Sequence, residues 1–249
     1  MITAGIDLAA QPERTAACLV RWEDGRAAVL ELRRDGVDDG QISALIDRAD
    51  RTGIDVPLGW PDGFIAAISA HHAAQGWAGG DLAHLRMRAT DEWVHRRTGR
   101  WPLSVSTDRI GVPALRAARV LADIPAAADR SGGGPVVEVY PAAALSIWGF
   151  QSRRYKRVAG GAARRALVMA FRERTESWLE VAETDWVACE ASDDALDSLV
   201  AALVARAVAR GLTDTCPPAL QLVASREGWI MLPLDGSLAR LAEPADTMG

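Results

Sequence analysis

The sequence has few of the residues that build disulfide-stapled or zinc-bound proteins. Its three cysteines, Cys18, Cys189 and Cys216, lie far apart without a CxxC pair, so their spacing supports neither a zinc site nor a disulfide framework. There are only four histidines and no HExxH motif, which argues against a zinc hydrolase. We expect the cysteines to act as small buried hydrophobic residues.

Long hydrophobic runs are also missing. No run approaches the roughly 18 apolar residues of a membrane span, and the first residues lack a basic segment followed by an apolar one. Yet 49% of the 249 residues are hydrophobic, enough for a sizeable core. We therefore expect a soluble, cytoplasmic protein with no membrane partner, folded as a single domain over residues 1–249.

Lysine is nearly absent, because Lys156 is the only lysine among 28 basic residues. The net charge of −5 argues against a protein that coats nucleic acid nonspecifically. Residues 153–174 are the exception, with eight cations against a single acid. This stretch is either a phosphate-binding surface or a solvated helix face.

Apolar alternation predicts strands in the first part of the chain. Residues 2–10, 15–23 and 26–34 are expected to form an antiparallel meander, with the turn EDGR between the second and third strands. A helix over residues 38–52 that stops at Gly53 should follow, and then a short strand in IDVPLGWP, residues 54–61.

The remainder is expected to be mostly helical. Residues 62–130 are expected to form a helical insertion, and PVVEVYP a fifth strand. Residues 192–211 show the strongest helical pattern, and EGWIMLP is a candidate late edge strand. These elements predict an α/β fold with a mixed sheet and helices on both faces. A short right-handed crossover places the fourth strand parallel to the first or the third.

Three predicted strands each carry one carboxylate inside an apolar run: Asp7, Asp55 and Glu138. Buried acids that cluster can stay ionised if a divalent cation compensates them, and oxygen ligands suit Mg²⁺ or Mn²⁺. Asp194 and Asp197 lie three residues apart and so share one helix face, which makes them further candidate ligands. The alternative for Asp194 is a favourable interaction with the helix dipole in the first turn.

Several motifs occur in an order that resembles a known family. GIDLA, IDVPLGWP, EVYPAAAL and DDALDSLVAAL, together with RATDEWVHRRTG and YKR, resemble predicted nucleases of the ribonuclease H-like superfamily, a family catalogued as a domain of unknown function. The helix motif also resembles the terminal DAxDA helix of Holliday-junction resolvases, with Ser198 in place of the second alanine. The resemblance implies a ribonuclease H-like core with five strands in the order 3-2-1-4-5.

The resemblance further implies a metal-dependent nuclease. Asp7, Asp55, Asp194 and Asp197 would hold two Mg²⁺ or Mn²⁺ ions, Asp7 bridging them, and Asp194 or Glu138 would hold a water or act as the base. The cations expected to orient substrate phosphates are Lys156, Arg88, Arg153 and Arg154. The partner would be nucleic acid, DNA or RNA, and the oligomeric state stays open.

Two other interpretations remain. The chain could be a non-catalytic scaffold that binds nucleic acid or protein, with its acids paired to arginines. Alternatively, GIDLAAQPERT resembles the first phosphate loop of sugar kinases and actin-like ATPases, although no second glycine-rich loop follows in the usual pattern. Separately, Trp93 and Trp101 lie among arginines and are candidates for stacking on single strands.

Overall fold

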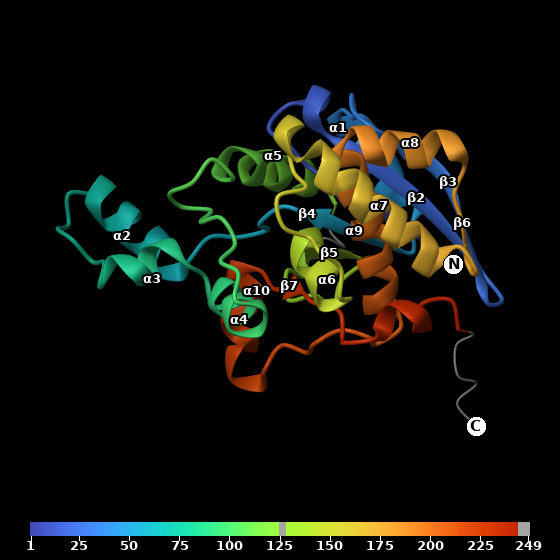
Figure 1. The fold of residues 1–249 in the computed structure, drawn as a ribbon. Coiled ribbons are helices and arrows are strands. Elements are labelled where there is room, and N and C mark those ends of the chain that lie inside the picture. The colour runs from blue at the N-terminus through green and yellow to red at the C-terminus, as the bar shows by residue number, and fades with distance from the viewer. Residues whose placement is uncertain (125–127, 244–249) are drawn as a thin grey trace.

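A computed structural model describes residues 1–124 and 128–243 as an α/β fold built on one mixed sheet of seven strands (Figure 1). The strand order is β6-β3-β2-β1-β4-β5-β7. The strands are β1 (Ile2–Asp7), β2 (Ala16–Glu23), β3 (Arg26–Arg33), β4 (Arg51–Asp55), β5 (Val136–Val139), β6 (Leu179–Glu180) and β7 (Ile230–Met231).

The predicted five-strand sheet was incomplete. Its order 3-2-1-4-5 is found in the centre, but two short parallel strands extend it, β6 beside β3 and β7 beside β5. The EGWIMLP segment supplies β7, as expected. β6 escaped prediction because two residues are too few to show an alternating pattern.

Helices cover both faces of the sheet, as predicted. The long helix α9 (Asp193–Ala209) packs on β1, β4 and β2, next to α6 (Pro141–Ile147) and α8 (Glu183–Ala191), and α7 (Gly161–Thr175) packs against α8. On the opposite face, α1 (Asp39–Arg48) and α5 (Gly111–Leu121) share a second hydrophobic cluster with the sheet. Twelve of the 17 residues of α9 are buried, because the sheet lies on one side of it and helices on the other.

The predicted helix over residues 38–52 was too long. Helix α1 begins after Asp38, whose side chain accepts from the Gln41 amide while the Gln41 side chain accepts from the Asp38 amide. It ends at Arg48, and β4 begins at Arg51. Gly53, interpreted as a helix stop, therefore lies inside a strand.

Four helices fill the segment between β4 and β5, where a helical insertion was predicted. They are α2 (Asp62–His72), α3 (Leu82–Arg86), α4 (Ala89–Thr98) and α5, and residues 125–127 of the predicted insertion lie outside the described residues. Figure 1 shows α2 and α3 projecting away from the sheet, whereas α4 lies beside α10 (Gln221–Glu227). Within the described residues, no helix has the length and apolarity to cross a membrane.

Candidate metal centre

The site begins with two neighbouring strands that end on the same residue type. In the parallel pairing of β1 with β4, Asp7 lies opposite Asp55, and each is the last residue of its strand. Because side chains alternate between the faces of a sheet, residues in register point the same way. Of the two predicted neighbours of the fourth strand, the first is the actual one, and the parallel pairing brings Asp7 and Asp55 to one end of the sheet.

Two glycines bring α9 unusually close to these strands. Gly5 lies opposite Gly53, each two residues before its aspartate and so on the same face. A Cβ atom at Gly5 would lie 2.0 Å from the Ser198 carbonyl oxygen, and one at Gly53 would lie 2.5 Å from that of Ala201. Only glycine fits at either position, so the repeated Gly-Ile-Asp sequence sets the distance between α9 and the aspartates.

This close approach places Asp197 of α9 against the two strand acids. The carboxylates of Asp7, Asp55 and Asp197 each offer an oxygen within 4.8 Å of the others. We call these three residues the carboxylate cluster. Asp7 and Asp55 are partly buried, whereas the side chain of Asp197 is only 1% exposed.

The carboxylate cluster has one cation for three acids. Lys156 Nζ lies 2.7 Å from Asp197 Oδ2 and 3.9 Å from Asp55 Oδ2, and the Tyr155 hydroxyl donates to Asp197 Oδ1 at 2.6 Å. Lys156 is thus the charged partner of Asp197 Oδ2, and among the described residues Asp55 has only the longer contact with the same ammonium group and Asp7 forms no ion pair. The cluster thus has oxygen atoms to spare for a further cation.

Burial makes the full charge of the cluster costly. It raises the pKa of Asp7 well above its ordinary value, and the Asp55 carboxylate raises it further. Burial also raises the pKa of Asp55 to about 7, although Lys156 acts to lower it. The pKa of Asp197 is likewise raised by burial, against the opposing effect of Lys156. A divalent cation would relieve this repulsion, and three carboxylates are the hard oxygen ligands that Mg²⁺ and Mn²⁺ take.

A buried arginine holds the segment that carries Lys156. Arg164 of α7 is 5% exposed and donates to the carbonyl oxygens of Tyr155 and Arg157, at 2.9 and 3.1 Å. Burial alone would lower the pKa of Lys156, but Asp197 above all, and then Tyr155 and Asp55, raise it well above its ordinary value. The lysine is therefore a charged, fixed member of the site, with 43% of its side chain still exposed.

Sequence reasoning did not assign roles to Tyr155 or Arg164. A compositional signal for Tyr155 exists, since the chain has only two tyrosines and one of them directly precedes the only lysine. The other, Tyr140, follows β5, and the charges of Asp55 and Lys156 act on its hydroxyl. Arg164 carried no comparable signal, because it is one of several arginines in a basic stretch.

Asp194 lies at the edge of the site, outside the carboxylate cluster. Its carboxylate is 3.4 Å from Arg14 Nε of the β1–β2 connection and is not part of the carboxylate cluster. Burial, followed by the neighbouring Asp193, raises its pKa, while Arg14 opposes that shift. The i, i+3 spacing predicted the shared helix face correctly, but Asp194 is one turn nearer the exposed start of α9.

Glu138 was predicted to flank the metal site, and the structure places it on the other face of the sheet. In the pairing of β4 with β5 it lies opposite Ile54, one residue before Asp55, so its side chain points away from α9. There Glu138 Oε1 accepts from Arg88 Nη2 at 2.7 Å, and Oε2 accepts from Arg88 Nη1 and the Leu58 amide.

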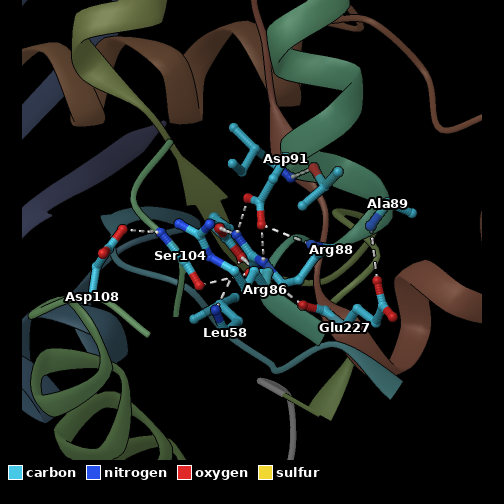
Figure 2. Close-up of polar contacts among 11 residues, drawn as sticks. Leu58, Arg86, Arg88, Ala89, Asp91, Ser104, Asp108 and Glu227 are labelled. Atoms are coloured by element: carbon cyan, nitrogen blue, oxygen red, sulfur yellow. Dashed lines mark hydrogen bonds and ion pairs between the residues drawn. The ribbon is translucent and has the colours of Figure 1, made fainter. Parts of the chain in front are cut away.

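Arg88 was predicted to bind substrate phosphate, but it is buried in this network (Figure 2). Besides Glu138, its guanidinium donates to both carboxylate oxygens of Asp91 and to the Glu227 carbonyl oxygen. We call Arg88, Asp91, Glu138 and Glu227 the Arg88 network. Arg88 therefore has no free donor to offer a substrate, and the hydrogen bond from the Leu58 amide to Glu138 Oε2 ties down the segment that follows β4.

The two remaining predicted phosphate ligands are exposed. Arg153 and Arg154 lie between α6 and Lys156, and Arg154 has a φ of +60°. Their side chains form no ion pair within the described ranges, so both remain available to a ligand. A phosphate-binding role for them stays a prediction.

The sequence pattern of a family described as "Protein of unknown function (DUF429)" matches residues 5–221. The chain belongs to that family. The matched span runs from before Asp7 to beyond Asp197 and so contains the whole carboxylate cluster, Lys156 and the Arg88 network except Glu227. Neither the curated proteins nor the solved structures include a match.

Proposed function

We propose that this protein is a metal-dependent nuclease that hydrolyses phosphodiester bonds with Mg²⁺ or Mn²⁺. The observation that carries the proposal is the carboxylate cluster, in which acids from two strands and a distant helix converge with too little positive charge. The order of the five central strands and the position of α9 are those expected of a ribonuclease H-like fold, which supports the same proposal.

In this proposal, the acids, the tyrosine and the basic residues of the site have separate roles. Asp7, Asp55 and Asp197 would hold the ion, which supplies Lewis-acid stabilisation of charge on the phosphoryl oxygens. Tyr155 keeps one oxygen of Asp197 occupied and so fixes the direction of the other. Lys156, with its partly exposed side chain, would bind a substrate phosphate beside the carboxylates, and Arg153 and Arg154 would hold the neighbouring phosphates.

One observation favours a second candidate, a non-catalytic scaffold. Lys156 already neutralises part of the cluster at 2.7 Å, so the fold can hold these acids together without an ion. In that case the same basic segment would bind nucleic acid, and the acids would serve to position Lys156.

Metal titration separates the two candidates. Mn²⁺ at about 100 times its dissociation constant should stabilise the protein by about 2.7 kcal/mol if it binds only the folded state. We expect the thermal midpoint to rise with Mn²⁺ in the parent protein and in Asp47→Asn, an exposed acid of α1, but not in Asp7→Asn. A rise of equal size in Asp7→Asn would contradict the metal site.

The activity itself requires a cleavage assay. Single-stranded, duplex and branched DNA and RNA should be incubated with Mg²⁺ or Mn²⁺, and at least one should be cut by the parent and by Asp47→Asn but not by Asp7→Asn or Asp197→Asn. Mn²⁺ stabilisation without cleavage of any substrate would leave a metal-binding scaffold and refute the nuclease.

A further inference from the structure

Trp101 presents an aromatic ring to solvent in a fixed orientation. The residue is 49% exposed, and its ring stacks on that of His95 in α4, with centroids 4.0 Å apart and planes 14° from parallel. One face of the indole is therefore covered and supported. Trp93, the other tryptophan considered for stacking, is instead partly buried and packs on Trp229 with centroids 5.8 Å apart.

The residue before Trp101 ties this ring to the candidate metal centre. The Arg100 guanidinium donates to the carbonyl oxygen of Ser152 at 3.2 Å and to its hydroxyl at 3.1 Å. Ser152 begins the segment that ends at Lys156, whose ammonium contacts Asp197. Four residues reach at most about 14 Å, a distance that a few nucleotides of a strand can span.

Positive charge lies along this short path. Arg153 and Arg154 are exposed between Ser152 and Lys156. Burial raises the pKa of Tyr140 most, and Asp55 raises it further, while Lys156 and Arg100 both act to lower it, so Arg100 and the cluster act on the same hydroxyl. An aromatic platform beside a row of cations is the arrangement that binds single strands, with bases stacked and phosphates paired.

We propose that Trp101, supported by His95, is a stacking site for a base of single-stranded nucleic acid whose phosphates follow Arg153 and Arg154 toward the carboxylate cluster. This rests on the proposed nuclease function, because it names the substrate class of the same site. A duplex would not serve as well, because its bases are already stacked inside the helix and offer no free face to the indole.

The chain offers a matched control for Trp101. Trp77 is 57% exposed, but it lies in the connection between α2 and α3, within a stretch from Gly63 to Gly80 that contains no aspartate, glutamate, lysine or arginine. Trp77 is thus a similarly exposed tryptophan with no lysine or arginine near it in the sequence. Losing it removes a similar aromatic surface from a part of the molecule that we do not assign to nucleic acid.

The test measures binding of a fluorescein-labelled oligothymidylate of about 15 nucleotides by fluorescence anisotropy. The buffer contains EDTA so that no cleavage occurs. We expect Trp101→Ala to weaken binding about tenfold, Trp101→Phe to retain most of the affinity, and Trp77→Ala to match the parent. The dependence on salt should also differ. Arg153→Ala should reduce the slope of log affinity against log salt by about 0.7, whereas Trp101→Ala should leave it unchanged.

Several results would overturn the proposal. These are parent-like binding by Trp101→Ala, equal weakening by Trp77→Ala, equal loss of affinity for a duplex of the same length, or no binding of the oligonucleotide by the parent. Circular dichroism of each variant shows whether it has folded, and the phenylalanine variant keeps the test valid if the alanine variant has not. Because the assay contains no metal, its outcome is independent of Mn²⁺ stabilisation and of cleavage, so failure here and failure of the nuclease are distinguishable.

Discussion

The carboxylate cluster and the Arg88 network both place acids beside the central strands, on opposite faces of the sheet. In the Arg88 network, all four carboxylate oxygens of Asp91 and Glu138 accept a hydrogen bond from Arg88 or from a backbone amide. In the carboxylate cluster, three acids share the single ammonium group of Lys156 and one phenol hydroxyl.

This difference separates acids that build the fold from acids that can bind a ligand. A buried carboxylate with every oxygen satisfied contributes to stability, and it has no capacity left for a metal. A carboxylate with unsatisfied oxygens costs stability until a cation binds, and such costs are concentrated at functional sites. Asp7 and Asp55 of the carboxylate cluster look like Glu138 of the Arg88 network in the sequence, where each is a lone acid in an apolar run.

The sharpest way to break the Arg88 network is to remove its cation. Arg88→Met leaves Glu138 and Asp91 buried without a counter-charge, and we expect a loss of about 3–5 kcal/mol in the free energy of unfolding. Urea unfolding measures it. Arg48→Met, which removes a half-exposed arginine paired with Glu31, should change stability little, and an equal loss in both variants would contradict the assigned role of Arg88.

The approach of α9 can be tested next. Gly5→Ala places a methyl group against the α9 backbone, so we expect a loss of about 2–3 kcal/mol and a loss of stabilisation by Mn²⁺, as Asp197 is pushed from the strands. Gly40→Ala in α1 is the control, because a Cβ atom at Gly40 would lie at an ordinary 3.5 Å from its nearest atom, Oδ1 of Asp38. If Gly5→Ala keeps the parent's response to Mn²⁺, close packing does not set the site.

Neutralising one acid in each group should change stability in opposite directions. Asp91→Asn removes a partner of Arg88 and should lower the free energy of unfolding by about 1–2 kcal/mol. Asp7→Asn removes repulsion and should raise the thermal midpoint in EDTA. Thermal unfolding of both variants in EDTA measures these changes. A shift of the thermal midpoint in the same direction in both variants would contradict the proposed difference between the two groups.

The stability of the folded protein should also depend on pH. Burial raises the pKa of Asp55 to about 7, above the value of about 3.9 in an unfolded chain. The folded state therefore binds more protons between these values, so the free energy of unfolding should fall as pH rises from about 4 to 7, by up to about 1.4 kcal/mol per pH unit for this group. The raised pKa of Lys156 acts only at alkaline pH, outside this window.

Asp55→Asn isolates the effect of Asp55 on this pH dependence. Urea unfolding in EDTA at several pH values should show a shallower fall for this variant than for the parent. Identical profiles would show that Asp55 titrates normally in the folded protein.

The parts of the fold that the sequence predicted are those with a repeated local pattern. Alternation identified β1, β2 and β3, and the apolar stripe around Leu199 identified α9. Asp7 and Asp55 were found because each is an acid between apolar residues of a predicted strand, and Asp197 because it lies beside the apolar stripe of α9. The overlong α1 and the missed β6 have local causes, since Gly53 resembles a helix stop and β6 is too short to show a period.

The positions of Glu138 and Arg88 were predicted wrongly because they depend on contacts between segments that lie far apart in the sequence. Whether Glu138 faces α9 depends on the register of β5 against β4, and a shift of one residue reverses the face. Arg88 looks like any surface arginine until Glu138 and Asp91 are brought to it by the fold. The pair of Gly-Ile-Asp sequences was a usable signal for the close approach of α9, because two glycines at matching positions imply a common packing partner.

The most direct test of the carboxylate cluster is a crystal structure of the protein soaked in Mn²⁺, with anomalous scattering to locate the ion. We predict a strong peak bounded by the carboxylates of Asp7, Asp55 and Asp197, and none beside Glu138 or Asp91. The metal site would be contradicted if, at saturating Mn²⁺, the carboxylate cluster showed no anomalous density or the density lay only at the Arg88 network.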